Sequence, residues 1–266
     1  MASRKEQKEA ARQRRLAEER ALADKVRRER RLRMLGGIVL GTIGVIAVIF
    51  AISNSGGNAS APKPTSPQAK NAAATVTKLL NGIPQQGNTL GNPNAKVTLT
   101  EYGDLVCPVC RDFALGTESQ LIANEVRQGK VKIVYKALET ASQTANNSMF
   151  VPSQTAALSA GQQKLGWYYI ELFYHEQGDE TTSYVTDSYL DGLAQQVPGL
   201  NYSKWSSDRQ SSTLASQVNA DQQAAANAGY NSTPTLVIQG PKGQAQPIVG
   251  NPTSYSQLQS AINSVS

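Results

Sequence analysis

The chain has 266 residues, enough for one large domain with additional segments, and its hydrophobic content of 39% is too low for a protein with many membrane spans. Two cysteines allow at most one intramolecular disulfide, which excludes a multi-disulfide scaffold, and one histidine excludes a histidine-rich metal site. The net charge of +6 comes from residues 1–33, which hold 13 Lys and Arg against 6 Asp and Glu. The other residues nearly balance, so no folded part has a surplus for binding nucleic acid, and we expect no such partner.

The first 52 residues have the pattern of a membrane anchor. Residues 34–52 carry no charge and, as a helix, would span about 28 Å, close to the ~30 Å hydrocarbon core of a bilayer. Because the basic residues precede this segment, we expect residues 1–33 in the cytoplasm and the C-terminal part outside, on a single-pass transmembrane helix that acts as a signal-anchor in the cell membrane. A cleaved signal peptide is the alternative, although the apolar segment exceeds the usual ~7–15 residues. The basic tail either sets the topology alone or also attracts anionic lipid headgroups.

A linker and a larger domain follow the predicted anchor. Residues 53–71 contain three prolines and no apolar side chain larger than alanine, which is typical of a linker. In residues 72–266 the patterns predict, in order, a helix over 73–80, a strand over 96–102, a helix over 107–127, a strand over 131–138, a mostly helical region over about 142–228, strands over 234–239 and 247–249, and a last helix begun by Thr253 or Ser254. This order indicates an α/β fold with an inserted helical subdomain.

Both cysteines of the chain lie in one C-x-x-C motif, Cys107-Pro108-Val109-Cys110, between the first predicted strand and its following helix. Residues i and i+3 at a helix start lie close enough for a disulfide, and the unpaired amides and helix dipole there stabilise a thiolate. Pro108 fits the first helical turn, which needs no amide donor. The motif therefore predicts thiol redox chemistry.

Other uses of the two cysteines are less consistent with the sequence. Zinc needs about four ligands, and His175 is the only further classical nitrogen or sulfur donor. A c-type haem site needs a histidine where Arg111 stands. We therefore expect no metal and no prosthetic cofactor, and a static structural disulfide remains the alternative.

Two further features belong to the same predicted site. Glu101 shares a strand face with Val97 and Leu99, where it either relays protons for thiol chemistry or ends the strand in solvent. The Thr233–Pro234 bond, at the start of a later strand, is a candidate for the cis form, which would leave backbone groups free to pair with an extended substrate. A trans proline that only opens the strand is the alternative.

With these motifs, the stretch from Leu99 to Cys110 and the later Thr233-Pro234-Thr235 resemble the DsbA-like branch of the thioredoxin superfamily, over about residues 88–264. The resemblance implies a thioredoxin-like fold whose helical insert lies within the 127 residues between Cys107 and Pro234. It implies a protein thiol–disulfide oxidoreductase with Cys107 as the exposed nucleophile and Cys110 as the buried resolving thiol. The other site residues that it implies are the acidic Glu101 and a substrate-binding set formed by Thr233, Pro234, Pro108 and Val109.

The resemblance also implies partners but leaves the direction of the chemistry open. The substrates would be exported cysteine-containing proteins, and the cysteine pair itself would be the redox carrier. An oxidase would need a DsbB-like or VKOR-like membrane partner, and a reductase an inward electron donor. Some members have a buried lysine on the second strand, for which Lys132 and Lys136 are both candidates. The alternative function is a membrane-anchored protein-binding module with a static disulfide.

One departure from the resemblance concerns the strength of oxidation. Strongly oxidising members have histidine in the dipeptide, where this chain has Val109. Valine supplies neither a donor nor a charge to the Cys107 thiolate. We therefore expect a Cys107 pKa below the free value of ~8.5 but above the ~3.5 of DsbA itself, and a milder oxidant.

Overall fold

The computed structural model describes residues 63–145, 147–251 and 254–266. The predicted basic tail (1–33), membrane segment (34–52) and most of the predicted linker (53–71) lie outside these residues. In the described ranges, no helix combines the length and the apolar character needed to cross a bilayer.

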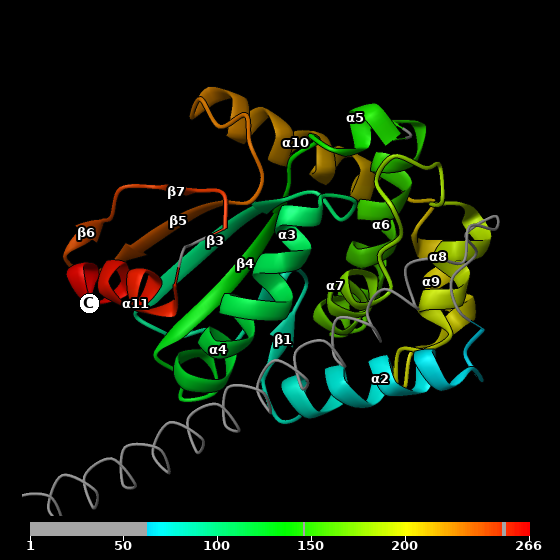
Figure 1. Ribbon diagram of the computed structural model, residues 1–266, viewed down its shortest axis with the longest axis horizontal. Helices are drawn as coiled ribbons and strands as arrows, with labels where there is room; N and C mark the ends of the chain where they lie inside the picture. Colours follow the sequence, from blue (N-terminus) through cyan, green and yellow to red (C-terminus); the bar gives the residue numbers. More distant parts are fainter. Residues whose placement is uncertain (1–62, 146, 252–253) are drawn as a thin grey trace, which may run out of the picture. The chain divides into compact units, whose positions relative to one another are not determined.

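A twisted sheet forms the centre of the described domain (Figure 1). Its longest strands, β3 (Val97–Gly103) and β4 (Val131–Ala137), are parallel neighbours, and β5 (Thr235–Gly240) runs antiparallel on the other side of β3. The order is β1-β2-β4-β3-β5-β6, with β7 also paired to β5; the short strands are β1 (Gln85–Gln86), β2 (Thr89–Leu90), β6 (Gly243–Gln244) and β7 (Ile248–Val249). The four predicted strands are confirmed within one residue at each end.

The connection between β3 and β4 is one helical segment, as predicted, but part of it is π-helix. It consists of α3 (Pro108–Phe113), η1 (Ala114–Glu118), α4 (Ser119–Leu121) and η2 (Ile122–Val126). A π turn holds an extra residue and changes which side chains face inward. In this segment it accompanies the burial of Glu118, the last residue of η1.

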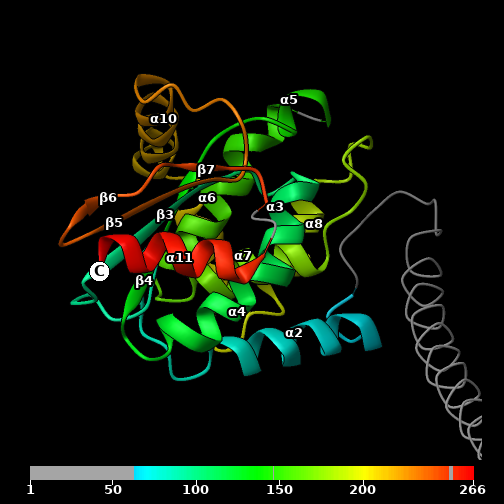
Figure 2. The ribbon, with the colours of Figure 1, turned by 60° about the vertical axis from the view of Figure 1, so that its left-hand side comes forward.

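One face of the sheet carries the main hydrophobic core. Val97, Leu99 and Glu101 are buried on this face, as the alternation predicts. The connecting segment and α11 (Tyr255–Val265) pack against it (Figure 2). Ser254 caps α11 by accepting a hydrogen bond from the Gln257 amide, which decides between the two predicted caps.

The helical insert between β4 and β5 is confirmed, and it contains more helices than the sequence resolves. Its elements are α5 (Ser142–Ala145), η3 (Asn147–Met149), α6 (Phe150–Gly161), α7 (Gly166–His175), α8 (Asp187–Ala194), α9 (Tyr202–Asp208) and α10 (Ser212–Asn227). The helix α10 packs on β4, and α6 packs on α7 (Figure 1). Aromatic side chains such as Trp167, Tyr169 and Trp205 are fully buried inside it.

The helix before the sheet, α2 (Pro67–Leu80), starts six residues earlier than predicted. Ser66 caps it by accepting from the Ala69 amide, and Pro67 occupies its first turn. Ala69 is buried although it lies in the range assigned to the linker, because α2 packs closely against α7. Small apolar residues can therefore belong to a packed helix where composition alone indicates a linker.

Candidate active site

The C-x-x-C motif lies at the carboxyl end of β3, where the chain turns into α3. Cys107 is the N-cap of this helix and Pro108 occupies its first turn, as predicted. Both cysteines are free thiols in the structure. Cys110 is fully buried and Cys107 keeps 6% of its surface exposed, so the expected exposed nucleophile is in fact mostly covered.

The loop that precedes β5 covers Cys107. The Thr233–Pro234 bond is cis, as predicted. The Cys107 thiol donates to the Thr233 carbonyl oxygen, with Sγ and O 3.6 Å apart, and the Thr233 hydroxyl is paired with that of Thr140 at 2.5 Å. Cys107 and Thr233, which are 126 residues apart in the sequence, therefore meet at the more accessible of the two sulfur atoms.

The two thiols differ in acidity. A hydrogen bond from the Cys110 thiol, together with others from the Thr233 side chain and from the Cys110 and Val109 amides, lowers the pKa of Cys107 to about 6 against the opposing effect of burial. This value lies inside the range expected from the sequence. Burial raises the pKa of Cys110 well above its usual value. At neutral pH the pair is therefore a thiolate at Cys107 beside a protonated Cys110.

The turn between β3 and Cys107 is held by Asp104, which the sequence reasoning missed. Its buried carboxylate accepts hydrogen bonds from the amides of Val106, Thr140 and Ser142, at 3.0, 2.9 and 2.9 Å, and from the Ser142 hydroxyl at 2.7 Å. The sequence contained a signal, because an aspartate just after a strand often accepts from the amide two residues later. Asp104 thereby joins the active-site turn to the start of the helical insert.

Glu101 points into the core beneath the cysteines and is fully buried, which excludes the solvent-exposed alternative. Burial raises its pKa to about 8. Two further glutamates, Glu118 from η1 and Glu171 from α7, are equally buried and interact with Glu101. The sequence reasoning missed both, although a glutamate inside the apolar run from Trp167 to Tyr174 is an unusual position that could have indicated one of them.

Neither candidate for the buried lysine lies beside Glu101. Lys132 donates to the Pro93 carbonyl oxygen at the surface, and Lys136 lies 3.8 Å from Asp221. Side chains alternate along β4, so both lysines lie on the opposite face of the sheet. The strand partner of Glu101 is Tyr135, whose buried ring stands where the resemblance implied a cation.

Gly103 provides the space in which Tyr135 and Glu101 meet. A β-carbon at this glycine would lie 2.7 Å from Cε2 and 3.1 Å from the hydroxyl oxygen of Tyr135, and 3.2 Å from Glu101 Oε1. We expect Gly103→Ala to lower the free energy of unfolding by about 1–3 kcal/mol, because rigid neighbours must shift. Urea unfolding measures this, with Gly116→Ala as control, where a β-carbon would have no neighbour within 4 Å. Equal effects of the two substitutions would contradict the argument.

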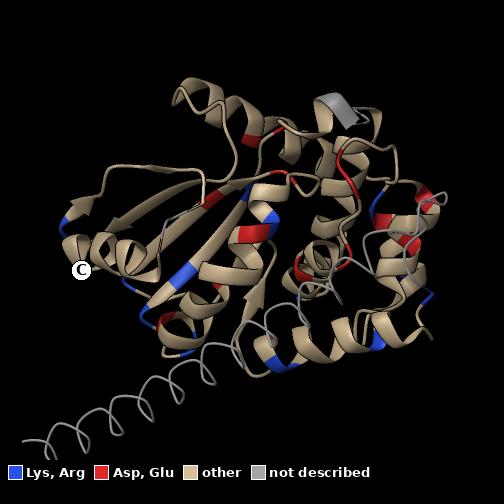
Figure 3. Ribbon diagram, viewed as in Figure 1, with Lys and Arg blue, Asp and Glu red and all other residues tan. Residues whose placement is uncertain are grey.

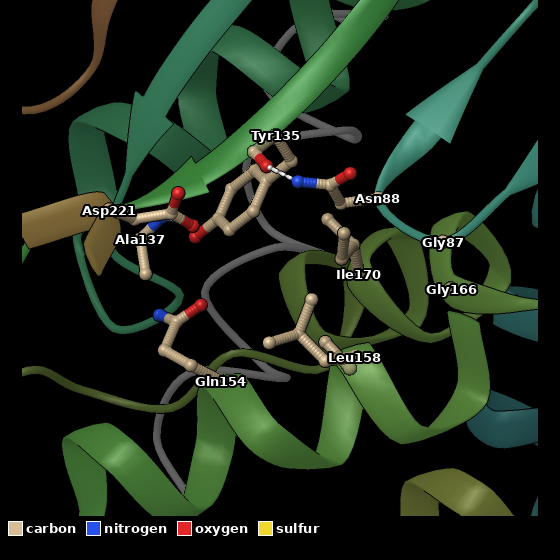
Figure 4. A pocket seen from close by; sticks show the side chains of 10 residues that line it. Gly87, Asn88, Tyr135, Ala137, Gln154, Leu158, Gly166, Ile170 and Asp221 are labelled. Carbon is tan, nitrogen blue, oxygen red and sulfur yellow. Dashed lines mark hydrogen bonds between the residues drawn. The ribbon is translucent and has the colours of Figure 1, made fainter. Parts of the chain in front are cut away.

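A groove adjoins the Thr140–Thr233 contact. It has a volume of about 710 Å³ and lies between the start of the insert and α10; its lining includes Thr140, Gln143, Asn219, Gln222, Tyr230 and Asn231. A separate cavity of about 10 Å³ lies beside the Tyr135 backbone, whose carbonyl oxygen accepts a hydrogen bond from the Asn88 side chain (Figure 4). That is about the room of one water molecule, and the side-chain nitrogen of Gln154, which lines the cavity, has no hydrogen-bond partner among the described residues.

The described residues contain no cluster of side chains that could bind a metal ion. No cluster of three or more His, Cys, Asp or Glu in these ranges is arranged to hold an ion. Lys and Arg lie on several separate elements (Figure 3).

Comparisons with known proteins bear on both fold and site. A family model described as thioredoxin matches residues 85–264. The disulfide bond formation protein D of Bacillus subtilis is 24% identical over 180 residues, which cover 65% of this chain and 74% of that protein. Oxidised BdbD from Bacillus subtilis has a similar crystal structure, with a TM-score of 0.57, 20% identity, and coverage of 78% of this chain and 98% of that one. Chlamydia trachomatis DsbA is also similar in structure, with a TM-score of 0.55, 16% identity, and coverage of 66% and 90%.

Proposed function

We propose, given that this chain belongs to the thioredoxin family, that its Cys107–Cys110 pair exchanges disulfides with cysteines of exported proteins outside the cell membrane. The chain is a DsbA-like thiol–disulfide oxidoreductase with a helical insert in its α/β fold. The observation that carries the proposal is the asymmetry of the pair. The Cys107 thiolate accepts a hydrogen bond from the Thr233 side chain, while Cys110 is buried and protonated.

The oxidative half-reaction follows from this asymmetry. A substrate thiolate attacks Cys107 Sγ of the disulfide form, the Cys107–Cys110 bond breaks, and Cys110 leaves with the electron pair and takes up a proton. A second substrate thiolate then attacks the substrate sulfur of the mixed disulfide, and Cys107 leaves as a thiolate. The substrate gains a disulfide and the enzyme is reduced by two electrons.

The acidity of Cys107 supports oxidation as the main direction. A pKa of about 6 makes its thiolate a good leaving group and stabilises the reduced enzyme, which is what makes a disulfide oxidising. The reduced pair must then be reoxidised. We propose a DsbB-like or VKOR-like membrane quinone reductase for this step.

The groove beside the Thr233 loop supports an unfolded polypeptide as substrate. Its lining contains several side-chain amides, among them those of Gln143, Gln222 and Asn231. An amide both donates and accepts, so it can pair with the main chain of an extended peptide of any sequence. The groove also lies close to Cys107. Thr140, which lines it, is hydrogen-bonded to Thr233, and Thr233 in turn contacts Cys107.

Equilibration with a glutathione series tests the proposed function. We expect the Cys107–Cys110 disulfide to exchange readily and the protein to oxidise a reduced, unfolded model protein. A pair that stays unreactive in the native protein would instead support the static disulfide of a protein-binding module.

Val109 gives a prediction about oxidising strength. Its side chain is 39% exposed and its amide already contributes to the Cys107 thiolate, so a histidine there can add a donor or a charge without disturbing the core. We expect Val109→His to lower the Cys107 pKa below about 6 and to shift the glutathione equilibrium toward oxidation of substrate. Ultraviolet absorbance of the thiolate, titrated against pH, measures the first effect.

A matched control for this prediction is Tyr202→His, which places histidine at a similarly exposed helix position away from the cysteines. It should leave the titration unchanged. An unchanged Cys107 pKa in Val109→His would show that the dipeptide does not set the acidity of the thiolate.

The location is part of the proposal. We propose a single-pass protein of the cell membrane, with residues 1–33 cytoplasmic and the catalytic domain outside, supported by the uncharged segment 34–52 and the basic residues before it. Protease added to right-side-out spheroplasts should digest the C-terminal domain and spare the tail. A protected C-terminal domain in sealed spheroplasts would refute this orientation.

A further inference from the structure

Three buried carboxyl groups lie together beneath the cysteine pair. Glu101 comes from β3, Glu118 from η1 and Glu171 from α7, and none has any exposed surface. No N–H group and no hydroxyl of the described residues donates a hydrogen bond to any of the six carboxyl oxygens, so the carboxyl groups have only one another as partners. The chain has thus placed three ionisable groups from separate elements in one apolar region, although a single acid would serve the proposed chemistry.

The groups that face this cluster do not neutralise it. They are the two cysteines at the start of α3, Tyr135 of β4 and Tyr174 of α7, with Asp104 nearby, and none of them is a cation. The ion pairs found in the described part of the chain involve other residues. Three negative charges in a region of low dielectric constant would repel strongly, so the cluster holds protons at neutral pH. In agreement, burial raises the pKa of Glu101 and of Glu171 to about 8.

Glu101 and Glu118 have a direct geometric relation. Their carboxyl groups are close enough to hydrogen bond, which two carboxyls can do only when one of them carries a proton. Burial and the neighbouring glutamates raise the pKa of Glu118 well above its usual value, so Glu118 is the proton-bearing donor. The π turn that ends at Glu118 is the element that buries this carboxyl in the site.

We propose that Glu118 and Glu171 are positioning residues that set the protonation of Glu101, the buried acid through which Cys110 gains and loses its proton. The proposal rests on the proposed function. Together, the carboxyl groups of Glu101, Glu118 and Glu171 hold more protons at neutral pH than one carboxyl group would. We call these three groups the proton store.

The proton and electrons balance within the proposed half-reaction. When the substrate thiolate forms a bond to Cys107 Sγ, the electron pair of the broken disulfide stays on Cys110, which takes the proton of Glu101. The products are a neutral Cys110 thiol and a Glu101 carboxylate that accepts a hydrogen bond from protonated Glu118. During reoxidation by the membrane partner, the Cys110 proton returns to Glu101 as the thiolate attacks.

The two positioning residues affect Glu101 in opposite ways. The donor Glu118 stabilises the Glu101 carboxylate, so its loss raises the pKa of Glu101. Glu171 is a like-charged neighbour that ionises in the same pH range, so its neutralisation lowers the pKa of Glu101. A purely structural role for either residue would not give opposite shifts.

The test measures the protonated-carboxyl infrared band of the full-length reduced protein against pH, and the rate at which reduced glutathione opens the disulfide, expressed per glutathione thiolate. We expect Glu118→Leu to move the band midpoint upward and to slow opening about tenfold at neutral pH, the size of one lost hydrogen bond. Glu118→Gln keeps a donor and should restore opening to within about twofold. Glu171→Gln should move the midpoint downward.

Glu125→Gln is the matched control, because Glu125 lies in the same connecting segment but pairs with Lys130 and Tyr255 away from the cysteines. It should change neither readout. If Glu118→Leu does not fold, Glu118→Gln and Glu171→Gln still decide the question, since each must remove intensity from the protonated-carboxyl band.

Two outcomes distinguish the failure of this proposal from the failure of the proposed function. A wild-type protein whose disulfide does not open with glutathione refutes the function. A wild-type protein that exchanges normally, while the glutamate variants keep its band midpoint and its opening rate, refutes the proton store alone.

Discussion

Cys107→Ser is expected to lower the rate of disulfide exchange with a peptide dithiol more than about 1,000-fold, because the attacked sulfur and the leaving thiolate are lost together. Cys110→Ser is expected to behave differently. Its Cys107 still forms mixed disulfides, but no second thiol can resolve them, so substrate proteins accumulate bound to the enzyme. Non-reducing gels and mass spectrometry of the trapped species measure this.

Alkylation of the reduced native protein provides the control for these roles. Cys107, with a pKa of about 6 and some exposed surface, should react first, whereas the fully buried and protonated Cys110 should react only after unfolding. Selective alkylation of Cys110 would reverse the assignment of the two residues.

The second large effect concerns stability against pH. Burial raises the pKa values of Glu101 and Glu171 from 4.5 to about 8, so between these values the folded protein binds more protons than the unfolded chain. The stabilisation from these protons is complete below pH 4.5 and is lost as the pH rises through about 8. We expect the free energy of unfolding to fall by several kcal/mol over this range, since one unit of pKa shift corresponds to about 1.4 kcal/mol.

The Cys107 thiolate acts in the opposite sense, because its lowered pKa adds stability as the pH rises above about 6. The measurement is therefore urea unfolding of Cys107→Ser at several pH values, in which this contribution is absent. Adding Glu171→Gln should flatten the dependence on pH. A free energy of unfolding that stays constant or rises toward pH 8 would contradict the protonated state of the cluster.

The parts of the site that the sequence predicts are those with a local pattern. The motif from Cys107 to Cys110, the alternation around Glu101 and the Thr233–Pro234 loop can each be recognised from adjacent residues. Their meeting in space cannot, because it depends on β5 pairing with β3 across the whole insert.

The residues that the sequence reasoning missed depend on distant contacts. Glu118 and Glu171 come from separate helices, and only the packing of α7 against η1 makes them neighbours of Glu101. Neither Lys132 nor Lys136, the two candidates for the buried lysine, faces Glu101. The register of β4 against β3 decides which residue does, and it places Tyr135 there.

The contact between Cys107 and Thr233 has a consequence for protein synthesis, which proceeds from the N-terminus. A nascent chain that ends within the helical insert already contains both cysteines and Glu101, but it lacks the Thr233 side chain that helps to hold the Cys107 thiolate. It also lacks β5, the antiparallel neighbour of β3. The acidic thiol is therefore completed only after synthesis has passed Thr233, in the last fifth of the domain. An unfinished chain is less able to capture the cysteines of other growing chains.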